Sequence, residues 1–259
     1  MREALWSELL KARRSLLPAL TALAFTLITL VCGLFMFILA EPARARALGL
    51  LGDKAQLSGA AADWPGYLGL LAQAVAVGGL LVYSMIAIWV FGREFSDHTA
   101  KDLLALPTSR TTVVTAKFIL TAAWAMALAT AAAAAGLLLG ALLALPAWSA
   151  QTATAGVVRI LAAAALSAAL TTPLALAASI GRGYLAAVGV LFVLAFAAQI
   201  IAALGFGAWF PYSVPGLYAG IAGPGHDPPG PISVLLVLTT GAAGVAATLA
   251  WWRNADHDR

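Results

Sequence analysis

The side chains best suited to polar chemistry are concentrated in one stretch of this sequence, from Phe91 to Arg110. The stretch lies between two long apolar runs and carries charges of both signs, on Arg93, Glu94, Asp97, Lys101, Asp102 and Arg110. Such side chains form ion pairs and hydrogen bonds with another surface, and Leu103 and Leu104 would add apolar contacts. The stretch is therefore the candidate interaction site of the chain.

Capping residues predict how this stretch folds. Ser96 or Asp97 can begin a helix by accepting a backbone N–H bond, and Pro107 ends it. Ser109 can then cap the next helix. We expect a short helix that lies across the membrane surface and is fixed at both ends. The alternative is a solvated loop whose charges only anchor the chain, but anchoring requires neither acidic residues nor a proline-terminated helix.

The sequence lacks the motifs of common enzyme classes. No G-x-x-x-x-G-K-[ST] phosphate loop occurs, which excludes ATP hydrolysis by the usual mechanism, and neither G-x-S-x-G nor H-E-x-x-H occurs. His98, His226 and His257 are far apart, so we expect no metal site and no catalytic residue. The apolar runs have no carboxylate at their centres, which disfavours an ion-coupled carrier and places the energy source outside this chain.

The composition indicates an integral membrane protein. Of the 259 residues, 62% are hydrophobic and only 10% are charged, whereas a soluble domain has about 25% charged residues. The net charge of +4 could suggest nucleic-acid binding. However, the charges cluster at the ends of apolar runs, which is typical of anchoring at an anionic membrane surface. We therefore expect membrane lipids, and no nucleic acid, among the partners.

Six apolar runs are long enough to cross a bilayer, and their lack of alternation predicts helices. The expected fold is an all-α polytopic membrane protein in which residues 1–259 form one transmembrane domain. The predicted spans are residues 16–40, 67–91, 112–145, 154–179, 184–208 and 232–252. The third run is longer than one span requires, and Pro173 predicts a bend in the fourth.

Two further segments are predicted to lie along a membrane surface. Residues 2–14 form an amphipathic helix with Leu5 and Leu9 on its apolar face and Lys11 on its polar face. Residues 209–231 mix Pro and Gly with aromatic side chains. This mixture favours a short re-entrant or interfacial hairpin over a free aqueous loop, which remains the alternative.

The distribution of Lys and Arg predicts the orientation of the spans. Eleven of the 15 Lys and Arg residues fall on the same side of the membrane as the first residue if the six spans alternate. The others are Arg44, Arg46, Lys54 and Arg159. The positive-inside rule therefore predicts that both termini face the cytoplasm. Abundant Ala and a preference for Arg over Lys suggest a bacterial cytoplasmic membrane.

The central stretch resembles that of permease subunits of ABC type 2 exporters, especially the bacitracin-resistance-like branch. The matching residues are Gly92-Arg93-Glu94, Thr99, Leu103-Leu104, Pro107, Ser109-Arg110 and Lys117. The N-terminal amphipathic helix, the six spans and the aromatic, proline-rich segment before the last span are also similar. The resemblance thus covers essentially the whole chain.

The resemblance implies that the central stretch is a coupling helix, held in a groove of a cytosolic ATP-binding subunit. That partner would bind ATP and Mg²⁺, while this chain would bind no cofactor and would not be an enzyme. Two such subunits would dock beneath a pair of permeases, either two copies of this chain or one copy and a paralogue. The implied docking residues are Arg93, Glu94, Phe95, Ser96, Asp97, His98, Thr99, Lys101, Asp102, Leu103, Leu104 and Arg110. Arg182, in the turn between spans four and five, is a second candidate contact, although a plain tight turn with one orienting arginine is the favoured interpretation.

The resemblance also implies that spans two and five line a substrate path at the dimer axis. The candidate residues are Gln73, Tyr83, Ser84, Met85, Phe192, Phe196 and Gln199, for which ordinary helix packing is the alternative. An apolar path suits a hydrophobic or amphipathic cargo, such as a peptide antibiotic, a drug or a lipid. Two other functions remain open. A membrane-embedded lipid-modifying enzyme would need a polar or metal cluster near one membrane face, and a non-transporting scaffold or regulator would bind an ATPase without moving cargo.

Overall fold

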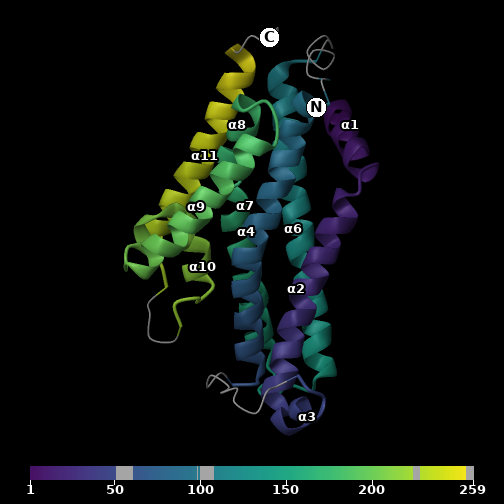
Figure 1. Ribbon diagram of the computed structural model, residues 1–259, viewed down its shortest axis with the longest axis vertical. Helices are drawn as coiled ribbons and strands as arrows, with labels where there is room; N and C mark the ends of the chain where they lie inside the picture. Colours follow the sequence, from purple (N-terminus) through teal and green to yellow (C-terminus); the bar gives the residue numbers. More distant parts are fainter. Residues whose placement is uncertain (51–60, 98, 100–107, 224–227, 255–259) are drawn as a thin grey trace.

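The computed structural model describes residues 1–50, 61–97, 99, 108–223 and 228–254. Within these residues the chain is helical, without strands, and six helical segments are long and apolar enough to cross a membrane (Figure 1). They are α2 (Leu17–Ala40), α4 (Trp64–Ser96), α6 (Arg110–Leu142), α7 with α8 (Ala150–Ala169 and Thr172–Ile180), α9 (Leu185–Ala203) and α11 (Pro231–Asn254). The all-α polytopic fold expected from the apolar runs is confirmed.

Helix α4 lies at the centre of the bundle, where it packs against α2, α6, α7 and α8. Both α4 and α6 contain 33 residues, which corresponds to about 50 Å at 1.5 Å per residue. The hydrocarbon core of a bilayer is only about 30 Å thick. These two helices therefore extend beyond it, and their extensions can carry polar side chains.

Short side chains allow α4 and α6 to lie close together. A Cβ atom added at Gly140 would lie 2.6 Å from the ring of Trp64, and one added at Gly136 would meet Leu71. The Gly136–Gly140 pair thus provides the close helix contact that small residues at this spacing predict. The start of α6 is capped as expected, because the Ser109 hydroxyl accepts a bond from the Thr112 N–H at 3.2 Å.

The fourth span is interrupted between α7 and α8, as Pro173 predicts. Residues at the break form hydrogen bonds with neighbouring segments in place of regular helical bonds. The Tyr212 hydroxyl donates to the Leu170 carbonyl at 3.0 Å. The Thr172 hydroxyl donates to the carbonyl of Gly241 in α11 at 2.7 Å. The break is therefore a point of close attachment between the fourth span and its neighbours.

The N-terminal helix α1 (Arg2–Arg13) lies at one end of the bundle, together with the ends of α4, α8 and the last described helix, α11 (Figure 1). We call this the termini end. The short helix α3 (Pro42–Ala47) lies at the opposite end. Helix α1 matches the amphipathic segment predicted at residues 2–14 and packs against α6 and α2.

The segment between α9 and α11 folds into short helices: η1 (Gly207–Trp209), η2 (Pro211–Ser213) and α10 (Val214–Tyr218). They pack against α7, α9 and α11, and α10 also contacts α4. In Figure 1 α10 lies beside the middle of the bundle, well short of the end occupied by α3. The described part of this segment is thus folded against the helices rather than free, while its depth in a bilayer stays a prediction.

Candidate functional site

The charged central stretch begins inside α4 and not in a helix of its own. Residues 93–96 form the last turn of α4, which ends at Ser96 and is followed by the capping residue Asp97. Ser96 thus lies inside α4, and Asp97 caps its end. The residues that a following short helix would occupy lie outside the described residues, so that helix stays a prediction. The other predicted docking residues of this stretch, His98, Lys101, Asp102, Leu103 and Leu104, lie outside the described residues, as does Pro107.

Four charged side chains from three helices meet at the termini end, and we call them the ion cluster: Glu8 and Lys11 of α1, Glu94 of α4 and Lys117 of α6. The Lys117 ammonium lies 2.8 Å from Glu8 Oε2 and 3.0 Å from Glu94 Oε1. The Lys11 ammonium lies 2.8 Å from Glu8 Oε1 and 2.7 Å from Glu94 Oε1. Each carboxylate is thus shared by two lysines.

The ion cluster is buried and balanced in charge. The side chain of Lys117 is 0% exposed, and those of Glu8 and Glu94 are each 4% exposed. Burying ions is unfavourable unless they are paired and hydrogen-bonded. Here Lys117 also donates to the Val90 carbonyl at 2.9 Å, and the Thr99 hydroxyl donates to Glu94 Oε2 at 2.8 Å. The cluster therefore ties α1, α4, α6 and Thr99, just beyond the end of α4, into one unit.

The position of Lys11 in the ion cluster shifts its pKa. Burial disfavours its charged form, but the neighbouring carboxylates of Glu8 and Glu94 outweigh that effect and raise the pKa of Lys11 above its ordinary value. The helical spacing predicted Lys11 on the polar face of the amphipathic helix, opposite its apolar contacts. The structure corrects this placement, because Lys11 reaches the buried carboxylates at the inner edge of α1.

Some predicted docking residues in the described part of the stretch are engaged in contacts within this chain, and others are exposed. Glu94 is enclosed by lysines of this chain, and Phe95 packs on Trp251 and Trp252 with ring centroids 5.8 and 5.6 Å away. Arg93 is half-buried and bonds to Asp97 at 3.0 Å. Ser96, Asp97 and Thr99 are exposed. The exposed residues are therefore the ones positioned to contact a partner, and that role stays a prediction for all of them.

The turn between α8 and α9 lies beside this stretch. A Cβ atom added at Gly92 would lie 2.8 Å from the Tyr184 ring and 3.1 Å from the Gly183 backbone. Arg182 in the same turn is exposed and adopts a φ of 48°. Arg110 reaches the end of α11, where its guanidinium donates to the Trp252 carbonyl at 3.3 Å. The structure thus brings Arg182, the end of α4 and the start of α6 to the same end of the bundle.

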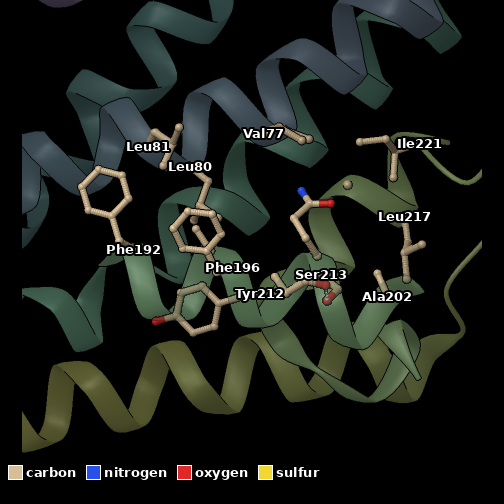
Figure 2. Close-up of a pocket in the computed structure, with 15 residues that line it drawn as sticks. Val77, Leu80, Leu81, Phe192, Phe196, Ala202, Tyr212, Ser213, Leu217 and Ile221 are labelled. Carbon is tan, nitrogen blue, oxygen red and sulfur yellow. Dashed lines mark hydrogen bonds between the residues drawn. The ribbon is translucent and has the colours of Figure 1, made fainter. Parts of the chain in front are cut away.

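An apolar pocket of about 250 Å³ lies between α4, α9 and the short helices that follow α9. Figure 2 shows Leu80 and Leu81 of α4 facing Phe192 and Phe196 of α9. The wall formed by η2 is fixed in place, because Tyr212 and Ser213 donate to the carbonyls of Leu170 and Ala198 at 3.0 and 2.9 Å. The pocket is therefore a preformed apolar recess within the spanning part of the chain.

The pocket contains some of the predicted substrate-path residues and excludes others. Phe192, Phe196 and Gln199 line it. Gln73 lies outside its lining and donates to the Gly220 carbonyl at 3.1 Å. Tyr83 and Ser84 are fully buried in the helix core, and Met85 is at the surface outside the pocket. Within the described ranges, no three His, Cys, Asp or Glu side chains gather closely enough to hold a metal ion.

Sequence reasoning missed Glu8 of the ion cluster and Tyr212 of the pocket wall. Glu8 interrupts the apolar side of α1, next to Leu9 and one helical turn before Ala12, and Lys117 likewise interrupts the apolar run of α6. An acidic and a basic residue, each inside an otherwise apolar face, are a signal for a buried pair. No comparable signal marks Tyr212, because its partner is a backbone carbonyl at the break between α7 and α8.

Comparisons with known proteins agree with this architecture. The family model described as ABC-2 family transporter protein matches residues 4–198. The bacitracin transport permease protein BCRB of Bacillus licheniformis is 25% identical to this chain over 179 residues, covering 69% of this chain and 85% of that protein. No solved structure matches the chain. The matched region contains the ion cluster, the charged stretch and Phe192 and Phe196 on the α9 side of the pocket. The chain belongs to the ABC-2 family of transporter proteins, as a multi-pass membrane permease of the bacitracin-resistance-like branch.

Proposed function

We propose that this chain is the membrane-spanning subunit of an ATP-driven exporter in a bacterial cytoplasmic membrane, with both termini cytoplasmic. A separate cytosolic ATPase, present in two copies, would bind ATP and Mg²⁺ and supply the energy. A second permease, identical or a paralogue, would complete the path. Family membership supports transport, the missing phosphate loop supports a separate ATPase, and the excess of Lys and Arg at the termini end supports the orientation.

The cargo class that we propose is hydrophobic or amphipathic, and the apolar pocket carries this proposal. Its lining is almost entirely apolar, with Phe192, Phe196 and leucines around one amide, that of Gln199. Such a lining binds apolar surface and orients it through few polar groups. The similarity to a protein named for bacitracin transport makes a peptide antibiotic the first cargo to test.

The ion cluster suggests how motion would pass from the ATPase to the spans. In this proposal the ATPase contacts the exposed residues at the end of α4 and the segment that follows. Because Glu94 and Lys117 bind α4 to α6 and to α1, the three helices would move together when the segment is displaced. Movement of α4 would change the width of the pocket, since Leu80 and Leu81 form one of its walls.

The test reconstitutes the chain with its co-purifying ATPase in lipid vesicles and measures ATP hydrolysis and the movement of labelled bacitracin. The expected result is ATP-dependent movement of bacitracin that stops when ATP is omitted. A complex that binds the ATPase but moves neither bacitracin nor other amphipathic peptides would favour the alternative function, a non-transporting scaffold or regulator. Chemical modification of the vesicle lipids in the absence of ATP would favour the other alternative, a membrane-embedded lipid-modifying enzyme.

A further inference from the structure

We propose that the seam between α6 and α11 binds an anionic phospholipid at the termini end. The headgroup phosphate would lie at Arg110 and Arg253, and an acyl chain would lie in an apolar groove further along α6, where α6 meets α7, the start of α8 and Val245 of α11. This site is separate from the pocket between α4 and α9 and does not depend on the identity of the cargo.

The headgroup part of the site is an open polar hollow. Ser109, Arg110 and Thr111 from the start of α6 and Arg253 and Asn254 from the end of α11 line it. Arg110 donates to the carbonyls of Trp252 and Arg253 at 3.3 and 3.5 Å, which holds the two helix ends together. Arg253 is exposed beside it. The exposed guanidinium of Arg253, the positive charge of Arg110 beside it and the nearby hydroxyl and amide groups suit the oxygen atoms of a phosphate.

The acyl-chain part is an apolar groove of about 320 Å³ at the break between α7 and α8. Phe118 and Met126 of α6, Ala165 and Ala168 of α7 and Val245 of α11 contribute to its lining. Ala165 is exposed, so the groove opens at the surface of the bundle. Because the groove lies within spanning helices, the medium that reaches it is the hydrocarbon of the bilayer.

Helix geometry places the two parts in the same leaflet. Phe118 follows Arg110 by eight residues in α6, and Val245 precedes Arg253 by eight residues in α11. At 1.5 Å per residue, the near end of the groove lies about 12 Å from the arginines along both helices. One leaflet contributes about half of the 30 Å hydrocarbon core. A lipid with its phosphate at the arginines therefore has its chains at the depth of the groove.

Charge complementarity selects an anionic lipid. A zwitterionic lipid carries a cationic group beside its phosphate, which two arginines would repel. A lipid such as phosphatidylglycerol has a net negative charge and no such group, and basic pockets between spanning helices bind anionic headgroups.

The test measures lipids retained by the purified full chain, using native mass spectrometry after exchange into mixtures of phosphatidylglycerol and phosphatidylcholine. We expect phosphatidylglycerol to be retained preferentially. Arg253→Gln should weaken its retention about 5-fold, since one arginine near a membrane surface contributes on this scale. Ala165→Phe should fill the groove and weaken retention comparably without changing any charge. Excess inorganic phosphate should not displace the lipid.

Matched controls are Arg159→Gln, which removes an exposed arginine from α7, and Ala134→Phe, which enlarges an exposed alanine of α6 outside the groove. Neither should change retention, and thermal melting of all four variants checks folding. Equal retention of both lipids, or wild-type retention by Arg253→Gln, overturns the site. Wild-type retention by Ala165→Phe overturns the groove, and displacement by phosphate shows a free-anion site instead.

Discussion

The ammonium group of Lys117 lies 3.0 Å from the carboxylate of Glu94, although 23 positions separate the two residues in the chain. The same ammonium lies 2.8 Å from Glu8, 109 positions away. One buried side chain thus connects the N-terminal helix, the central helix and the helix that follows the charged stretch. Three predictions concern this end of the bundle.

Lys117→Met should strongly destabilise the chain. Removing one member of a buried ion group leaves an uncompensated charge, which costs about 3–5 kcal/mol. Chemical or thermal denaturation in detergent measures the loss. Adding Glu8→Gln to Lys117→Met restores the charge balance with Lys11 and Glu94 and should recover part of the stability. Arg13→Met, an exposed change in α1, is the control. Wild-type stability of Lys117→Met would refute the importance of the cluster.

Alkaline pH should loosen α1 through Lys11. The folded-state pKa of Lys11 is raised above its ordinary value of 10.5. Its contribution to stability is therefore fully present below that ordinary value and is lost as the pH rises through the higher folded-state pKa. Melting temperatures from about pH 9 to about pH 12 should fall at the alkaline end. Lys11→Arg keeps its charge over this range, so its decline should be smaller. Identical declines for both proteins would contradict this assignment.

The spans were predictable because a helix in lipid requires about 20 consecutive apolar residues, and the sequence contains six such runs. The break in the fourth span and the cap of α6 were also predictable, since Pro173 and Ser109 act through local geometry. The extension of α4 through Ser96 was not predictable in this way. Propensity favours a helix start at Ser96, but the packing of Phe95 on the tryptophans of α11 and the pairing of Glu94 continue the helix.

The ion cluster could not be predicted from local sequence patterns. Glu8 and Lys11 are one turn apart on α1, but their partners Glu94 and Lys117 come from distant segments. Only the tertiary arrangement of α1, α4 and α6 brings them together. The residues predicted to line a substrate path divide in a similar way, because Phe192, Phe196 and Gln199 of α9 line the pocket, whereas Tyr83 and Ser84 of α4 are buried in the core. Their role in transport stays a prediction.

Close packing of α4 on α6 should make Gly140 intolerant of even a methyl group. Gly140→Ala places a Cβ atom 2.6 Å from the Trp64 ring, and overpacking of this kind costs about 1–3 kcal/mol. Gly189→Ala in α9 makes the same chemical change where no atom lies within 4 Å. Alanine is the better helix former, so Gly189→Ala should be neutral or slightly stabilising. Equal melting temperatures for the two variants would contradict the close contact.

Phe196→Ala should weaken the response to cargo without disturbing the fold. The side chain lines the pocket yet is 66% exposed in the isolated chain, so its loss removes little internal packing. Loss of an aromatic contact of about 1.5 kcal/mol should raise the half-maximal bacitracin concentration for ATPase stimulation about ten-fold. Leu185→Ala, on the same helix but outside the pocket, is the control. An unchanged response in Phe196→Ala would exclude this pocket as the cargo site.

Different substitutions should disrupt binding of the proposed ATPase and stability of the ion cluster, so the two effects can be measured separately. Glu94→Gln should lower the melting temperature because Lys11 and Lys117 lose a charged partner, and any loss of the ATPase would then follow from misfolding.

Leu103→Glu with Leu104→Glu changes the predicted docking segment instead. It should abolish co-purification of the ATPase while leaving the melting temperature of the isolated chain unchanged. Leu48→Glu with Leu50→Glu makes the same exchange at exposed positions beside α3, at the opposite end of the bundle, and should retain the ATPase. An ATPase that stays bound to the Leu103 and Leu104 variant would place the docking surface elsewhere, because two added charges at an apolar contact cannot be accommodated without loss of binding.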